Sequence, residues 1–265
     1  MQISQPFVRE AGTGPPVVCI HSNASSSAQW RGLMEGLSTS RRILAPDCYG
    51  SGKSPQWPLD REMFLEDEVR FLEPVFSQAG DPFAIVGHSY GAAVALKAAL
   101  LHPERVNALA LYEPTLFALV DAQAPPPNGV DGIRNAAAAS AEALKRQNRD
   151  EAASHFIDFW MGAGSWAATP PQRKPAIADS VVNVRHWAHA LFREPAPLQT
   201  FAQLDIPILY MVGDRSPESA QAVARVLIPK LPRVTTVRFP ELGHMAPVTH
   251  PEAINAAIAQ FLSEV

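Results

Sequence analysis

A short segment in the first half of the chain, Gly87-His88-Ser89-Tyr90-Gly91, most constrains how the chain folds. An apolar run at residues 83–86 precedes it, and an Ala- and Leu-rich run at residues 92–101 follows it. A strand that passes at once into a helix needs a very tight turn, and a glycine on each side of the serine supplies room for that turn. The segment therefore predicts a strand–turn–helix unit with the Ser89 hydroxyl at the helix N-terminus, where backbone amides favour developing negative charge.

Apolar runs that end in turns recur along the chain and predict a parallel sheet. They lack polar alternation, which is typical of strands buried on both faces. The predicted strands are residues 17–20, 42–45, 83–86, 108–112, 208–212 and 235–239. Helix-like segments occur at residues 28–37, 61–76, 92–101 and 251–262. This order predicts an α/β chain with a mostly parallel, doubly wound sheet.

The alternation of strands and helices lapses between residues 116 and 203. This stretch holds consecutive prolines at 125–127, an Ala-rich helical run at 135–146, and three tryptophans. We interpret it as a helical cap inserted between two strands of the sheet. The predicted division is a core in two parts, residues 1–115 and 204–265, around a cap of residues 116–203.

Charge and composition limit the partners that we expect. The net charge of −4 and the isoelectric point near 6.1 favour neither a nucleic acid nor an anionic membrane surface. The first 16 residues lack the pattern of a signal peptide, and no apolar run approaches the roughly 20 residues of a membrane span. The two cysteines, Cys19 and Cys48, do not make a disulfide framework. We expect a cytoplasmic protein with a small-molecule substrate, and this interpretation allows a homodimer.

Four segments together resemble the α/β-hydrolase family over nearly the whole chain. They are the serine segment above, residues 10–18, residues 46–54, and Gly243-His244 after the last predicted strand. The resemblance implies the α/β-hydrolase fold, with Ser89 as nucleophile and His244 as general base. A base is required because a serine hydroxyl is a weak nucleophile at neutral pH.

The chain departs from this family after its first parallel strand. The usual His-Gly-x is replaced by His-Ser-Asn at residues 21–23. By position, the resemblance implies that the backbone amides of Asn23 and Tyr90 form the oxyanion hole. Residues 21–30 look like the same stretch of haloalkane dehalogenases. Relatives with dehalogenase or epoxide hydrolase activity carry aspartate at the position of Ser89, so the serine argues against both activities.

The acid of the implied triad has two candidates. Family members usually carry aspartate three residues after the glycine that ends the strand before the last. Here Ser216 occupies that place, and Asp214 comes two residues early. Some relatives carry the acid just after the strand that follows the elbow helix, where this chain has Glu113. A carboxylate there faces the crevice at the carboxyl ends of the strands, so we favour Glu113 and keep Asp214 as the alternative.

The triad implies hydrolysis through an acyl-enzyme on Ser89, without a metal ion or an organic cofactor. We expect a carboxylesterase-like serine hydrolase that cleaves a small-molecule ester. A lactone, thioester or carbon–carbon bond is open to the same triad, and a non-catalytic small-molecule-binding member of the fold is the alternative outside enzymes. Aromatic side chains of the cap are candidates to line an apolar substrate pocket or to form the core of the cap. They are Phe156, Phe159, Trp160, Trp166 and Trp187.

Overall fold

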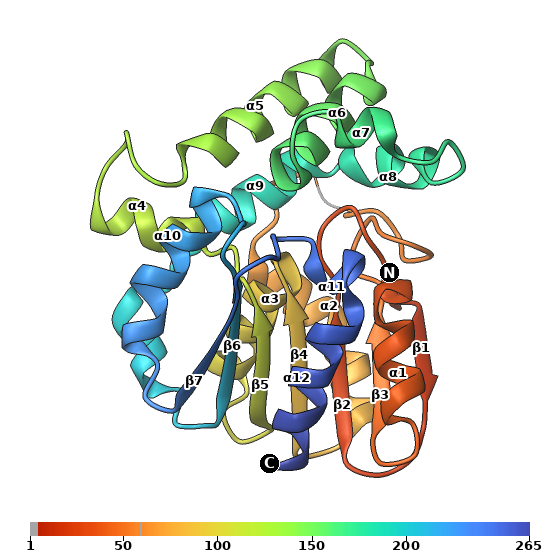
Figure 1. Cartoon of the computed structure of the whole chain (residues 1–265), viewed down its shortest axis with the longest axis vertical. Helices are drawn as coiled ribbons and strands as arrows, with labels where there is room; N and C mark the ends of the chain where they lie inside the picture. The colour runs from red at the N-terminus through yellow and green to blue at the C-terminus, as the bar shows by residue number, and fades with distance from the viewer. Residues whose placement is uncertain (1–4, 59) are drawn as a thin grey trace.

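The computed structural model describes residues 5–58 and 60–265. These residues form a seven-stranded sheet with the order β1-β3-β2-β4-β5-β6-β7 (Figure 1). The strands are β1 (Val8–Ala11), β2 (Pro16–Ile20), β3 (Arg42–Pro46), β4 (Phe83–His88), β5 (Val106–Tyr112), β6 (Ile208–Gly213) and β7 (Val234–Phe239). β1 runs antiparallel to β3, and the other neighbouring pairs are parallel. The predicted α/β fold with its mostly parallel sheet is confirmed, and β1 adds a strand that the apolar runs did not predict.

Helices cover both faces of the sheet (Figure 1). One layer contains α1 (Arg31–Leu37) and α12 (Pro251–Ser263), and the other contains α2 (Leu65–Ala79) and α3 (Tyr90–Leu101). Successive strand residues alternate between the layers: Cys19 packs in the layer of α1 and α12, and Ile20 in the layer of α2 and α3. Both faces of the central strands therefore exclude water, and each large aliphatic side chain buried there contributes about 1.5–3 kcal/mol. This burial explains the runs without polar alternation.

The helical insertion lies between β5 and β6, and Figure 1 shows it above the carboxyl ends of the strands. It contains α4 (Phe117–Gln123), α5 (Asp131–Lys145), α6 (Arg149–Met161), α7 (Ser165–Ala168), α8 (Lys174–Val181), α9 (Val184–Phe192) and the 3₁₀ turn η2 (Leu198–Gln203). The remaining elements are η1 (Ser27–Trp30), α10 (Glu218–Leu227), η3 (Ile228–Lys230) and α11 (Ala246–Thr249). The division into domains at residues 115 and 203 stays a prediction.

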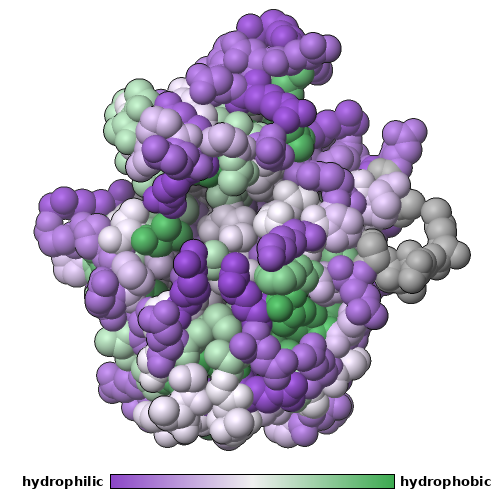
Figure 2. All heavy atoms as spheres, turned by 90° about the vertical axis from the view of Figure 1, so that its right-hand side faces the viewer, coloured by the Kyte–Doolittle hydropathy of each residue, from purple (hydrophilic) through white to green (hydrophobic). Residues whose placement is uncertain are grey.

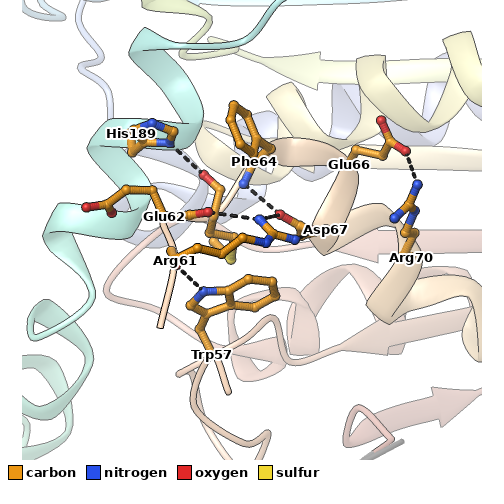
Figure 3. Close-up of polar contacts among 9 residues, drawn as sticks. Trp57, Arg61, Glu62, Phe64, Glu66, Asp67, Arg70 and His189 are labelled. Atoms are coloured by element: carbon orange, nitrogen blue, oxygen red, sulfur yellow. Dashed lines mark hydrogen bonds and ion pairs between the residues drawn. The ribbon is translucent and has the colours of Figure 1, made fainter. Parts of the chain in front are cut away.

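Helix α2 begins at Leu65, four residues later than predicted, because a polar turn precedes it (Figure 3). The Asp67 carboxylate accepts a hydrogen bond from the Phe64 amide at 2.9 Å, which caps the helix N-terminus. Two guanidinium nitrogens of Arg61 donate to the same carboxylate at 2.8 and 2.6 Å. Arg61 therefore belongs to the turn and not to the helix.

The same turn contacts helix α9 of the insertion. The Nδ1 atom of His189 lies 3.1 Å from the Met63 carbonyl oxygen, and because a carbonyl only accepts, Nδ1 carries the proton. The His189 ring also meets the Phe64 ring edge-on (Figure 3). Glu62 forms an ion pair with Arg185 of α9. These contacts attach α9 to the core of the protein.

Replacing Asp67 by alanine is expected to lower the free energy of unfolding by about 1–2 kcal/mol, because the change removes a helix cap and leaves Arg61 without its partner. Urea unfolding of the wild type and the variant measures this difference. Glu66→Ala is the matched control, since Glu66 sits in the same helical turn and, among the residues that the structure describes, pairs only with the exposed Arg70. We expect the control to cost less than about 0.5 kcal/mol. Equal losses in the two variants would contradict the capping role.

The surface carries few large apolar side chains. Among the described residues, those more than a third exposed are Phe64, Leu101, Met161 and Val265, which come from four separate segments. Figure 2 shows a mainly hydrophilic face with some hydrophobic areas in its lower half. Within the residues that the structure describes, no helix has the length and apolar character needed to cross a membrane. The homodimer stays a prediction.

Candidate active site

Ser89 occupies the tight turn between β4 and α3. Its φ of 57° lies in the left-handed region, which non-glycine residues rarely adopt. The two neighbouring glycines are required by close backbone contacts. A Cβ on Gly87 would lie 2.6 Å from the Ala92 Cα, and one on Gly91 would lie 2.3 Å from the Ile20 carbonyl oxygen. The strained turn directs the serine side chain away from the sheet.

Three buried side chains form a continuous hydrogen-bonded chain at this turn. The His244 Nε2 atom lies 2.8 Å from the Ser89 Oγ, and its Nδ1 lies 2.6 Å from the Glu113 Oε2. An ionised carboxylate only accepts, so Nδ1 carries the proton and Nε2 is free to accept the serine proton. The structure thus brings together the predicted nucleophile, base and favoured acid. Their catalytic roles stay predictions.

Glu113 is held where a carboxylate can orient the imidazole. It follows the end of β5 with a φ of 46° and is fully buried. Its second oxygen, Oε1, accepts a hydrogen bond from the Gly213 amide at 2.7 Å. The alternative acid is elsewhere: the carboxylate of Asp214 is exposed and accepts a hydrogen bond from the Arg238 Nε at 2.7 Å. The structure does not bring Asp214 to His244.

The backbone of the His244 loop is fixed from two strands. The Nε2 atom of His88 donates to the His244 carbonyl at 2.8 Å, and the Tyr112 hydroxyl donates to the Gly243 carbonyl at 2.8 Å. Burial lowers the pKa of His88 well below its ordinary value, and the neighbouring His244 lowers it further. His88 is therefore a neutral structural support, and the imidazole beside it keeps its position.

The two predicted oxyanion donors are both close to Ser89. Asn23 lines the same cavities as Ser89, and Tyr90 follows the serine at the start of α3. Within the described residues, neither amide donates to a backbone acceptor in a turn or loop. Their assignment as an oxyanion hole stays a prediction.

Behind Tyr90 lies a buried carboxyl group that sequence reasoning missed. Glu68 of α2 accepts hydrogen bonds from the Tyr90 hydroxyl and the Tyr49 amide, each at 3.0 Å. Burial raises its pKa to about 7, although these hydrogen bonds act in the opposite direction. No sequence signal could single it out, because an acidic residue within a helix is usually exposed.

Glu68 is expected to make stability depend on pH. The unfolded chain releases this proton near pH 4.5, whereas the folded chain keeps it until about pH 7. Between these values the folded state binds more protons, so the free energy of unfolding falls as the pH rises, by on the order of 3 kcal/mol. Glu68→Gln should remove this fall, measured by urea unfolding at pH 4.5 and pH 7.5. Parallel pH dependence of the wild type and Glu68→Gln would contradict the assignment, and Glu66→Gln serves as the exposed control.

Two small cavities meet at Ser89. The first is mainly apolar and extends beneath the insertion. It is lined by Asn23, Ser89, Thr115, Phe117, Ile133, Ala137, Phe156, Trp160, Val184, Trp187, Ala188, Leu191 and Phe192. The second reaches His244 and is lined by Ser22, Asn23, Ala24, Ser89, Phe156, Ile157, Trp160, Met161, His244 and Met245. Phe156 and Trp160 border both cavities.

The aromatic side chains predicted for the pocket divide into two groups. Phe156, Trp160 and Trp187 line the first cavity, and Trp160 also stacks on the His244 ring with centroids 3.9 Å apart. Phe159 and Trp166 line neither cavity at Ser89, so a pocket role for these two stays a prediction. Phe159 projects from another face of α6 and borders a surface hollow beside α11, whose lining also includes Trp160 and His244.

Trp166 belongs to the interior of the insertion. Its indole nitrogen donates to Asp150 at 3.0 Å, and its backbone amide donates to Asp158 at 2.7 Å. Apart from Trp187, the sequence analysis missed the residues of α9 that line the first cavity, which are Val184, Ala188, Leu191 and Phe192. The apolar spacing at residues 184, 187, 188 and 191 is the helical signal that would have found this part of the lining.

Comparison with known proteins places these features in a family. The pattern described as the alpha/beta hydrolase fold matches residues 15–251. A haloalkane dehalogenase of Agrobacterium fabrum is 37% identical over 108 residues, which are 40% of this chain and 35% of that protein. A 2-hydroxymuconate semialdehyde hydrolase of Pseudomonas sp. (strain CF600) is 35% identical over 111 residues, 39% of this chain and 38% of that protein. The matched segments thus span little more than a third of these two relatives.

A solved structure matches over almost the full length. It is an alpha/beta hydrolase from Sphaerobacter thermophilus, with a TM-score of 0.75, 25% identity, and coverage of 97% of this chain and 96% of that one. Since the family pattern also extends over most of the chain, this protein belongs to the alpha/beta hydrolase fold family.

Proposed function

We propose that this protein is a serine hydrolase that cleaves a small-molecule ester through an acyl-enzyme on Ser89. The observation that carries the proposal is the buried chain of hydrogen bonds from Glu113 through His244 to Ser89. A serine that only packs needs neither a base nor a strained turn. Membership of the family supports a hydrolase but leaves the bond that it cleaves open.

The reaction begins when the Ser89 Oγ attacks the carbonyl carbon of the ester. His244 Nε2 accepts the serine proton, and Glu113 stabilises the imidazolium that forms. The negative charge moves to the carbonyl oxygen, which the Asn23 and Tyr90 amides would hold, each for about 3 kcal/mol in the transition state. Collapse of this intermediate expels the alcohol, which takes the proton from His244. Water then attacks the acyl-enzyme by the same steps, and releases the acid and free Ser89.

The same proton transfers indicate which cavity holds the alcohol portion of the ester and which holds the acyl portion. The leaving oxygen must take its proton from His244, so the alcohol portion lies in the cavity that reaches His244. The acyl portion then lies in the first cavity, whose lining does not include His244. The apolar wall of that cavity favours an uncharged acyl group.

The serine at position 89 argues against dehalogenation, despite the similarity to a haloalkane dehalogenase. Displacement of halide by a serine oxygen would give an ether, which has no carbonyl for water to attack. The enzyme would then be trapped after one turnover. An ester or another carbonyl substrate avoids this trap.

The similarity to 2-hydroxymuconate semialdehyde hydrolase favours a second candidate, which is hydrolysis of that compound or of a related one through carbon–carbon bond cleavage. The same triad would serve it. Incubation with the compound, followed by mass spectrometry of the products, tests this candidate. Turnover much faster than that of simple esters would favour it over the carboxylesterase proposal.

A fluorophosphonate probe and p-nitrophenyl acetate together test the serine hydrolase proposal. The Ser89 Oγ should form a bond to phosphorus with loss of fluoride, seen as a mass increase on the peptide that contains Ser89. The wild type should also release p-nitrophenol, whereas Ser89→Ala should do neither. Absence of both labelling and turnover in the wild type would instead support a non-catalytic binding protein. Labelling of Ser89→Ala to the same extent would exclude this serine as the nucleophile.

A further inference from the structure

The acyl cavity contains a hydroxyl group that the proposed mechanism does not use. Thr115 follows Glu113 by two residues, lines the cavity beside Ser89, and is 1% exposed. Its Oγ1 has no hydrogen-bond partner within the described residues. The cavity wall around it is otherwise formed mostly by aliphatic and aromatic side chains.

Ordinary structural roles do not account for this hydroxyl. Threonine before a helix commonly caps it, but α4 begins after Leu116 and receives no side-chain cap. The contact that Thr115 makes at this turn comes from its backbone carbonyl, which accepts from the Phe117 amide at 2.9 Å. A buried hydroxyl without a partner is unfavourable, and valine would fill the same space without that cost. The feature therefore suggests that a ligand supplies the missing partner.

The position of Thr115 limits which part of a ligand can reach it. Thr115 borders the acyl cavity but not the cavity on the His244 side. The acyl cavity is small, so an oxygen bound by Thr115 lies only a few carbon atoms from the scissile carbonyl. The apolar remainder of the wall disfavours a charged group at the same place.

We propose that the substrate is an ester whose acyl group carries a hydroxyl or keto oxygen a few carbons from the carbonyl, and that Thr115 binds this oxygen. This inference rests on the proposed function and narrows its substrate class. Thr115 is a specificity-determining residue here, since its hydroxyl meets the substrate away from the reacting atoms. A keto oxygen would accept from Thr115, and a hydroxyl group could also donate to it.

A pair of esters matched in shape tests the proposal. Phenyl 3-hydroxybutanoate and phenyl 3-methylbutanoate differ by a hydroxyl in place of a methyl group. The measured quantity is the ratio of their kcat/KM values, hydroxy over methyl, in the wild type, Thr115→Val and Thr115→Ser. Because both esters are assayed on the same preparation, any misfolded fraction cancels from the ratio.

We expect the ratio to fall at least about tenfold in Thr115→Val, which keeps the shape but removes the hydroxyl, and to stay within about threefold in Thr115→Ser, which keeps the hydroxyl. An unchanged ratio in Thr115→Val, or an equal fall in both variants, would overturn the inference while ester hydrolysis by the wild type stands. If the wild type hydrolyses neither ester nor p-nitrophenyl acetate, the proposed function fails, and this inference fails with it.

Discussion

Replacing Ser89 by alanine is expected to lower kcat for ester hydrolysis by a factor on the order of 10⁴–10⁶, because no other group in the site can form the acyl-enzyme. The hydrogen bond from Ser89 to His244 joins the nucleophile directly to its base. Stability should change little, since alanine fits the space and the Ser89 amide still donates to the Tyr112 carbonyl. Initial rates with p-nitrophenyl acetate, together with urea unfolding of both proteins, measure the two effects.

The hydrogen-bonded chain of Glu113, His244 and Ser89 also predicts that the losses of kcat in single variants are not additive. His244→Ala alone should cost nearly as much as Ser89→Ala, and the double variant should be no slower than either single variant, because either change already disables the unit. The rate that remains above the uncatalysed reaction would come from binding and from the oxyanion amides. If the two losses of kcat multiply in the double variant, the two residues act in separate steps, which would contradict the proposal that they act as one unit.

Much of the fold could be predicted because the parallel strands are buried on both faces. That burial demands unbroken apolar runs, and such runs mark β2 to β6 clearly in the sequence, whereas β7 at the sheet edge is only partly buried. The edge strand β1 was not predicted because it is short and only partly buried. Arg9 and Glu10 interrupt the apolar run that would have indicated a strand. The start of α2 was misjudged for a different reason. The Arg61 side chain pairs with Asp67 from outside the helix, a tertiary contact that helical periodicity does not reveal.

In the candidate site too, the residues that depend on local sequence were predictable, and those that depend on tertiary packing were not. The positions of Ser89 and His244 were predictable because the roles proposed for them need a particular turn and a particular place after a strand, and both requirements show in the local sequence. The lining of the cavity depends on which face each helix of the insertion presents. Phe156 and Trp160 are four residues apart and share a face of α6, whereas Phe159 lies on another. Without the packing of α6 against its neighbours, the three aromatic residues could not be distinguished.

Replacing Glu113 by glutamine is expected to lower kcat by a factor of about 10³–10⁴. Glutamine keeps the size of the side chain and an oxygen that can accept from Gly213, but it removes the charge that stabilises the His244 imidazolium. Its amide group can also donate to Nδ1, which would favour the imidazole tautomer that cannot accept the serine proton. The substrate still fits the cavities, so KM should change much less than kcat.

Asp214→Asn is the matched control, because it removes one carboxylate charge from the loop after β6. Its carboxylate pairs with Arg238 at the surface and, within the described residues, makes no hydrogen bond with His244, so kcat should stay within about twofold of the wild type. Steady-state kinetics of the two variants with one ester therefore separate the candidate acids. The reverse ranking, with Asp214→Asn strongly impaired and Glu113→Gln active, would mean that the loop after β6 rearranges during turnover and that Asp214 is the acid.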